Sequence, residues 1–180
     1  MTALLIGRTI CMLDFISAEV SQAMTGIDTH GSPTANVLHS GNFSKSMHFS
    51  EGSYEHIAER FFKTLNYDTF YLEYDNLRSG GFEPLRFLPQ HKNVVLGVVT
   101  TKDPALEDAE MIKSRVRQAA EIIAKGQGRS VEQAMENIGI SPQCGFASVA
   151  VGAEGMTEEK MFAKLKLVKD VAKELWPDRP

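Results

Sequence analysis

The sequence predicts an α/β fold with a parallel sheet, because short apolar segments alternate with longer segments of helical periodicity. The segments predicted as strands are 35–38, 68–73, 93–100 and 138–141. Of these, 68–73 and 93–100 are nearly continuous in apolar residues, as expected of strands that are buried on both faces of a sheet. Four such strands would form either a small open α/β domain or half of an eight-stranded barrel.

Helices are predicted where apolar residues recur every three or four positions. Ser53 and Thr157 are suitable N-caps for two of them, and Asp103-Pro104 is a start signal for a third. The last helix should bury a stripe of five apolar residues. The predicted helices are 9–24, 53–65, 104–126, 130–137 and 157–176, and the stripe is Phe162, Leu165, Val168, Ala172 and Leu175.

The composition is that of one ordinary globular domain, residues 1–180, with no linker that divides it. Hydrophobic residues make up 43% of the chain, which is enough to form a core. The formal net charge of −4 makes a nucleic acid or an anionic membrane surface an unexpected partner. No apolar run is long enough to span a bilayer, and no signal peptide is indicated.

The chain has two cysteines, Cys11 and Cys144, in no pattern that suggests a disulfide scaffold. A reducing compartment is therefore expected, and the cytoplasm is the predicted location. Cys144 follows a predicted strand and lies between a Pro and a Gly. That setting suits a metal ligand, a nucleophile or an inert buried thiol.

Three potential metal ligands lie where predicted strands end, which is where functional groups collect in parallel α/β folds. His39 follows the first strand, Glu73 ends the second and Cys144 follows the fourth. Zinc accepts nitrogen, oxygen and sulfur ligands of these types, and catalytic zinc sites leave one position open for substrate or water. From the residues alone, each side chain also has an ordinary interpretation: a solvated His, a salt-bridging Glu and a buried thiol.

Two long motifs resemble the cobalamin-independent methionine synthases and their shorter relatives. One is Phe70-Tyr-Leu-Glu-Tyr-Asp75 with Arg78-Ser-Gly-Gly-Phe-Glu-Pro-Leu-Arg-Phe87, and the other is Ser141-Pro-Gln-Cys-Gly-Phe-Ala-Ser148. Segments 94–102 and 163–168 are similar to the strand between them and to the last helix of that family. The resemblance runs from about Val37 to Trp176. It implies a partial (β/α)₈ barrel of the TIM type, made of about the last four β/α units, with the N-terminal half absent.

The same resemblance identifies Glu73 and Cys144 as zinc ligands. The family's other two ligands come from a His-x-Cys pair before Gly-Asn-Phe, and here that stretch reads Val37-Leu-His-Ser-Gly-Asn-Phe43. Val37 cannot bind a metal, whereas His39 in the place of the Cys can. The expected site is therefore Zn²⁺ held by His39, Glu73 and Cys144, with a further position for a substrate thiol.

The resemblance implies a zinc-dependent methyltransferase of methionine biosynthesis. The family transfers a methyl group from 5-methyltetrahydrofolate, usually polyglutamylated, to the sulfur of homocysteine. Zinc would hold that sulfur as a thiolate, because a thiol with a pKa of about 8.5 is mostly protonated at neutral pH. The family's proton-donating His falls at Lys102, which indicates a different substrate or donor. Arg78 and Arg86 are interpreted as members of structural ion pairs, and no catalytic or substrate-binding residue is assigned.

Two other hypotheses remain open. The first is a noncatalytic, truncated remnant of the family, which Val37 and the missing N-terminal half favour. The second is a sister chemistry on the same barrel, such as decarboxylation resembling uroporphyrinogen decarboxylase, but that family does not need the Cys of the Pro142-Gln-Cys-Gly145 segment. A half barrel would leave sheet edges unpaired, so the expected outcome is either a homodimer that completes a barrel-like core or poor solubility.

Overall fold

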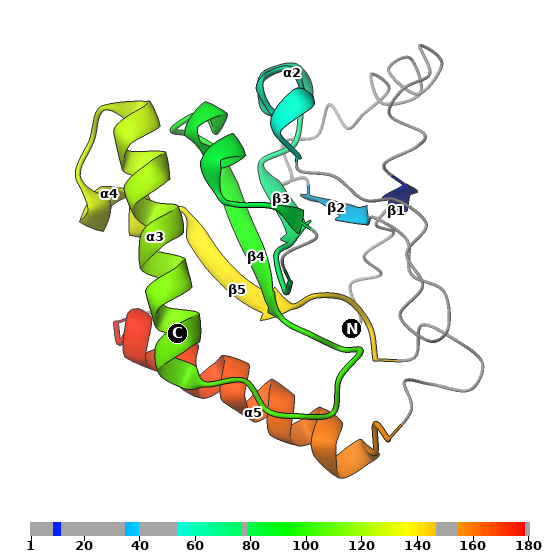
Figure 1. Ribbon diagram of the computed structural model, residues 1–180. Helices are drawn as coiled ribbons and strands as arrows, with labels where there is room; N and C mark the ends of the chain where they lie inside the picture. Colours follow the sequence, from blue (N-terminus) through cyan, green and yellow to red (C-terminus); the bar gives the residue numbers. More distant parts are fainter. Residues whose placement is uncertain (1–8, 12–34, 40–53, 77–78, 147–154, 179–180) are drawn as a thin grey trace, which may run out of the picture.

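The computed structural model describes residues 9–11, 35–39, 54–76, 79–146 and 155–178, and for the first two ranges it describes the backbone only. The described strands form one parallel sheet in the order β1-β2-β3-β4-β5 (Figure 1). Neighbours in sequence are neighbours in the sheet throughout. A barrel wall runs in this way, whereas a doubly wound sheet reverses its order at a switch point. The strands are Thr9–Cys11, Ala35–His39, Thr69–Glu73, Asn93–Val99 and Ile138–Pro142.

The four predicted strands are confirmed as β2 to β5, but the prediction of a helix from Thr9 is wrong. Thr9–Cys11 form β1 and pair in parallel with Val37–His39 of β2. The rest of that predicted helix, residues 12–24, lies outside the described residues. Short apolar runs with β-branched residues such as Thr9 and Ile10 fit a strand as well as a helix, and periodicity cannot separate the two.

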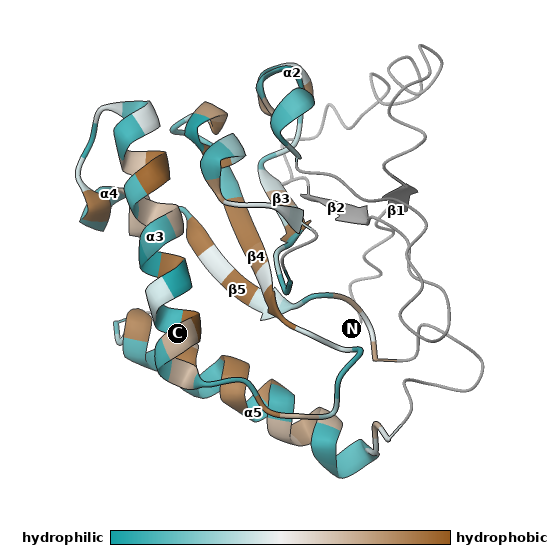
Figure 2. Ribbon diagram, in the orientation of Figure 1, coloured by the Kyte–Doolittle hydropathy of each residue, from teal (hydrophilic) through white to brown (hydrophobic). Residues whose placement is uncertain are grey.

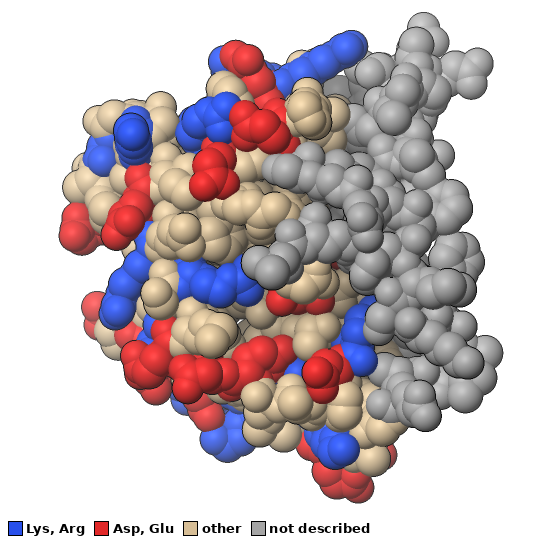
Figure 3. All heavy atoms as spheres, in the orientation of Figure 1, with Lys and Arg blue, Asp and Glu red and all other residues tan. Residues whose placement is uncertain are grey.

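The core lies where β3 and β4 meet the helices. Phe70 and Leu72 of β3 and Val94 and Leu96 of β4 are fully or almost fully buried. Hydrophobic residues dominate β4 and much of β5, whereas hydrophilic and hydrophobic residues alternate along the long helices (Figure 2). Figure 3 shows acidic and basic side chains interspersed on the face in view.

Helix α2, Ala58–Thr64, packs aromatic rings on the start of β3, and the 3₁₀ helix η3, Tyr54–His56, precedes it. The Phe62 and Phe70 ring centroids are 5.1 Å apart in an edge-to-face arrangement. The buried Lys92 donates hydrogen bonds to the carbonyl oxygens of Phe62, at 3.0 Å, and Leu65. It thereby satisfies carbonyl groups at the end of the helix. The predicted helix over 53–65 is therefore confirmed in part, in a shorter form.

Helix α3, Ala109–Gln127, begins later than Asp103-Pro104 predicts. Its N-cap is Asp108, whose carboxylate accepts a 2.8 Å hydrogen bond from the Met111 amide. Gly128 ends it with a φ of 65°. Gly126, the last residue of the predicted helix, lies within α3. A Cβ there would lie 2.2 Å from the Arg86 carbonyl oxygen of the 3₁₀ helix η5, Glu83–Phe87, so the glycine allows η5 to approach α3 closely.

Helix α5, Glu158–Leu175, begins at the predicted cap Thr157, and helix α4, Val131–Met135, is capped by Ser130, the first residue of the predicted segment 130–137. The predicted stripe on α5 is partly wrong, because the Phe162 and Leu165 side chains are 56% and 39% exposed. The buried positions are Lys164 and Val171. Lys164 and Val171 each lie one position before a residue of the predicted stripe, whereas Val168 and Leu175 of the stripe do pack against the core, so the packed face is rotated by less than one residue, about 100°, around the helix. Among the described residues, no helix has the length and apolar character to cross a membrane.

Candidate functional site

A pocket of about 260 Å³ opens at the carboxyl end of the sheet and contains both Glu73 and Cys144. The two residues come from different strands, and the structure thus brings together two of the three predicted ligands. The pocket is lined by Tyr71, Leu72, Glu73, Ser141, Pro142, Gln143, Cys144 and Gly145.

Glu73 is the last residue of β3 and its side chain is buried, with 2% of the residue exposed. Gln143 Nε2 donates a 3.0 Å hydrogen bond to Glu73 Oε1. The main chain of Glu73 is held as well, because its amide donates a 3.2 Å hydrogen bond to the Tyr54 hydroxyl. A buried carboxylate is unfavourable unless it is hydrogen-bonded, paired or bound to a metal. This setting therefore suits a metal ligand whose position is fixed by hydrogen bonds before a metal binds.

Cys144 follows β5, is half-buried and is not in a disulfide. Its Sγ lies 3.2 Å from Thr101 Oγ1 and accepts a 3.3 Å hydrogen bond from Lys102 Nζ. A positive charge beside a sulfur stabilises a thiolate more than a thiol. Lys102, which stands where the family's His falls, therefore lies in the site, next to the predicted sulfur ligand.

Gly97 of β4 lies between the two sides of the pocket. In the sheet register it pairs with Glu73 on one side and Ser141 on the other. A Cβ at Gly97 would lie 3.0 Å from Gln143 Cα and 3.1 Å from the Leu72 carbonyl oxygen. Because glycine has no side chain, the chain after β5 can approach β4 closely, and the Gln143 amide donates a 2.7 Å hydrogen bond to the Val99 carbonyl.

Two buried polar residues of the site, Thr101 and Gln143, were not predicted as functional. The Thr101 hydroxyl donates a 3.1 Å hydrogen bond to Gln143 Oε1. The available signal was their position, since Thr101 lies in the polar stretch after the third predicted strand and Gln143 precedes Cys144. Sequence reasoning treated both as surroundings of other residues, because contacts between separate strands are not visible in a linear pattern.

A buried ion pair holds the loop that carries Thr101 and Lys102. Lys164 Nζ lies 2.8 Å from Glu107 Oε2, and Lys164 is fully buried. The other oxygen of Glu107 accepts a 2.8 Å hydrogen bond from the Thr100 amide, and Lys164 also donates to the Ala105 carbonyl at 2.6 Å. Helix α5 thereby fixes the loop beside Cys144.

His39, the third predicted ligand, ends β2 next to β3. Its backbone neighbour Leu38 pairs with Leu72, so the ends of the two strands lie side by side. The side chain of His39 lies outside the described residues. Among the described side chains, no group of three His, Cys, Asp or Glu could hold a metal ion. The oxygen and sulfur donors of Glu73 and Cys144 nevertheless fit part of a zinc site.

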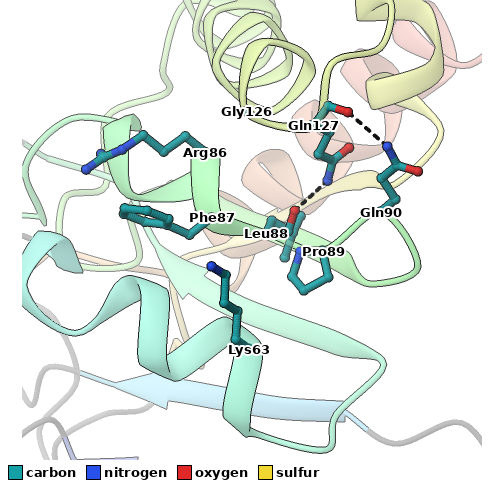
Figure 4. Close-up of a pocket in the computed structure, with 8 residues that line it drawn as sticks. All are labelled: Lys63, Arg86, Phe87, Leu88, Pro89, Gln90, Gly126 and Gln127. Carbon is teal, nitrogen blue, oxygen red and sulfur yellow. Dashed lines mark hydrogen bonds between the residues drawn. The ribbon is translucent and has the colours of Figure 1, made fainter.

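A larger hollow, of about 560 Å³, lies where α2 and α3 end (Figure 4). Two amide groups of its lining donate hydrogen bonds within the protein: Gln127 Nε2 donates to the Leu88 carbonyl at 2.7 Å, and Gln90 Nε2 donates to the Gln127 carbonyl at 2.9 Å. Arg86 forms an ion pair with Glu55, which confirms its structural role. None of the predicted ligands lines this hollow, so the smaller pocket is the candidate site.

Comparison with known proteins connects this pocket with a family. The model of the cobalamin-independent synthase catalytic domain matches residues 44–174. Two uncharacterized proteins of Bacillus subtilis, YxjG and YxjH, are 40% and 39% identical over 137 residues. These matches cover 76% of this chain but 33% of either relative, so the chain spans about a third of the length of its curated relatives.

Two solved structures are similar in fold. One, assigned as a vitamin-B12-independent methionine synthase from Listeria monocytogenes, has a TM-score of 0.58 and 26% identity over 87% of this chain and 39% of its own. The other, a B12-independent methionine synthase from Shewanella in complex with selenomethionine, has a TM-score of 0.62 over 88% of this chain and 42% of its own. At 17% identity the second shows the fold alone. The family model decides the assignment: the chain belongs to the cobalamin-independent methionine synthase family.

Proposed function

We propose that this chain is the C-terminal part of a zinc-dependent S-methyltransferase, in which His39, Glu73 and Cys144 hold Zn²⁺. The observation that carries the proposal is that Glu73 and Cys144, from separate strands, line one pocket at the carboxyl end of the sheet. Catalytic groups of parallel α/β barrels are found at this end. The uninterrupted order of the parallel strands supports a partial barrel.

The proposed reaction is methyl transfer to a thiol such as homocysteine, with 5-methyltetrahydrofolate or its polyglutamate as the donor. When bound, zinc would supply a substrate sulfur in the thiolate form. The buried carboxylate of Glu73 would bind the metal, and the pocket next to it would accommodate the substrate thiol. Lys102 keeps a positive charge beside the sulfur of Cys144. A thiol site of this kind requires a reducing compartment, so we place the protein in the cytoplasm.

The rest of the barrel is part of the proposal. Because the chain spans about a third of its curated relatives, most contacts to the methyl donor and to the amino-acid group of the acceptor are assigned to strands outside it. A second chain in a homodimer, or a separate N-terminal half, would supply these strands and cover the edges of the sheet.

Metal analysis of the purified 180-residue chain tests the proposal. We expect about one zinc ion per chain, lost in Cys144→Ser and in Glu73→Gln. Ser141→Ala is the matched control, because Ser141 lines the same pocket without being a proposed ligand; this variant should keep its zinc. A folded wild-type protein that binds no zinc from a zinc-buffered solution would refute the proposal.

A noncatalytic remnant is the second candidate, and Val37 in the first ligand position favours it. The variant Val37→His separates the two, because it restores the His of the family's pattern. If the natural chain is a weakened zinc protein, Val37→His should bind zinc more tightly than the wild type in a chelator competition. A remnant that has lost the site should gain no zinc from this one replacement.

A further inference from the structure

We propose that Gln143 is a positioning residue that holds the carboxylate of Glu73 for metal binding, and that Thr101 sets the orientation of the Gln143 amide. The inference rests on the proposed zinc site and adds two residues to it that bind no metal themselves. It rests on a series of hydrogen bonds that runs from the end of β4, through the segment after β5, to the end of β3.

All three residues of this series are buried: Thr101, Gln143 and Glu73 are 0%, 5% and 2% exposed. The Thr101 hydroxyl donates to Gln143 Oε1 at 3.1 Å, and Gln143 Nε2 donates to Glu73 Oε1 at 3.0 Å. Buried polar groups without partners are strongly destabilising, so these two hydrogen bonds restrict the side-chain conformations.

The chemistry of the Gln143 amide explains the direction of these hydrogen bonds. A carboxylate can only accept hydrogen bonds, whereas a Gln side chain has a donor at one end and an acceptor at the other. Because the Thr101 hydroxyl occupies the acceptor, the amide presents N–H to Glu73. A second contact at the acceptor, 3.6 Å from Cys144 Sγ, links the same amide to the other predicted ligand. Groups that orient metal ligands in this way typically affect metal affinity 10- to 100-fold.

The main chain at Gln143 is anchored independently of its side chain. Its amide bonds to the Val99 carbonyl at 2.7 Å, and the absence of a side chain at Gly97 permits this approach. Replacing the Gln143 side chain should therefore leave the course of the backbone unchanged. This separation makes a role in orientation distinguishable from a role in folding.

The test is a zinc titration in competition with a chromogenic chelator, together with the visible spectrum of the Co²⁺-substituted chain. Gln143→Met keeps a similar volume but has no N–H, so zinc should bind about 10- to 100-fold more weakly and the cobalt bands should shift. The metal-free variant should unfold at a lower temperature, because the buried Glu73 and Thr101 lose these hydrogen bonds, but circular dichroism should show it folded at the temperature of the titration. Thr101→Val should weaken zinc binding in the same direction, whereas Thr101→Ser, which keeps the hydroxyl, should behave as the wild type.

A double variant shows whether Thr101 and Gln143 act as one unit. In the Thr101→Val background, Gln143→Met should cause a smaller additional loss of zinc affinity than in the wild type, because the hydrogen bonds that run to Glu73 are already disrupted. Wild-type affinity and an unchanged cobalt spectrum in Gln143→Met, with zinc still lost in Glu73→Gln, would overturn this inference alone. A wild-type chain that binds no zinc would overturn the proposed function and this inference together.

Discussion

Helices α3 and α5 are nearly equal in length, with 19 and 18 residues, but they are held in different ways. Helix α3 buries Ile112, Val116, Ala119, Ala120, Ile123 and Ala124 on one face. Helix α5 buries only Val171 and Lys164, and it exposes Phe162 and Leu165. Hydrophobic burial thus secures α3, whereas a buried ion pair is a principal attachment of α5.

The position of each helix in the fold explains the difference. Helix α3 packs against η5 and α4 as well as α5, so it is enclosed by the described elements. Helix α5 follows β5, the last strand in the sheet order, and lies along the lower edge of Figure 1. In the described part of the chain, α5 packs against β5 and α3. We expect its exposed apolar residues to pack against the remainder of the barrel that the proposed function includes.

The largest expected effect is that of a charge in the face of α3. Val116 is fully buried, so Val116→Asp should destabilise the chain by about 4 kcal/mol or more, the range of an unpaired buried charge. Urea unfolding followed by circular dichroism measures this loss. The exposed neighbour Gln118 provides the control, since Gln118→Asp adds the same charge on the solvent side of the same helix. Equal stabilities of the two variants would contradict the burial of α3.

An intermediate effect is expected where α5 is held by its ion pair. Lys164→Met keeps the apolar length of the side chain but leaves Glu107, which is 22% exposed, without its ammonium partner. Breaking a buried pair in this way should lower the unfolding free energy by about 3 kcal/mol. Adding Glu107→Gln should restore part of it.

Lys166 offers a matched control on the same helix, because its pair with Asp170 is exposed. Lys166→Met should change the unfolding free energy little, since solvent screens such pairs. If Lys164→Met is as stable as Lys166→Met, the ion pair does not hold α5, and the comparison of the two helices fails.

The smallest effect on stability is expected at the exposed apolar residues of α5. Replacing both Phe162 and Leu165 by Ser should change the unfolding free energy by no more than about 0.5 kcal/mol. Self-association should fall, because exposed apolar patches favour association. Light scattering over a range of concentrations measures this change. A large loss of stability without a change in association would show that these residues belong to the core.

Much of the fold could be predicted from local patterns. The strands around Phe70 and Leu96 were predictable because apolar runs mark strands that are buried on both faces. Errors occurred where a local pattern allowed two structures: Thr9–Cys11 fits a strand or a helix, and the stripe on α5 shares Val168 and Leu175 with the face that packs. In both places the neighbouring elements determine which structure forms or which face packs, and the periodicity of one segment carries no information about those neighbours.

The candidate site shows the same difference between features that a local pattern predicts and features that depend on contacts between separate elements. Glu73 and Cys144 were predictable because Glu73 ends a strand, Cys144 closely follows one, and both lie in specific motifs. The orienting contacts of Thr101 and Gln143 depend on the irregular register of β4 and β5 between Gly97 and Val99. A register shift changes which side chains meet across strands. The spacing of residues within one strand does not predict such a shift.

The order of residues alone determined the class of fold, the strand ends and the chemical types of the proposed ligands, because these depend on local composition and motif. Only the tertiary structure decided that the carboxylate of Glu73 and the sulfur of Cys144 share a pocket, that an amide lies between them, and that Lys164 is buried. Each of these depends on atoms from separate strands or helices coming within hydrogen-bonding distance, and burial then decides how much each polar group requires its partner.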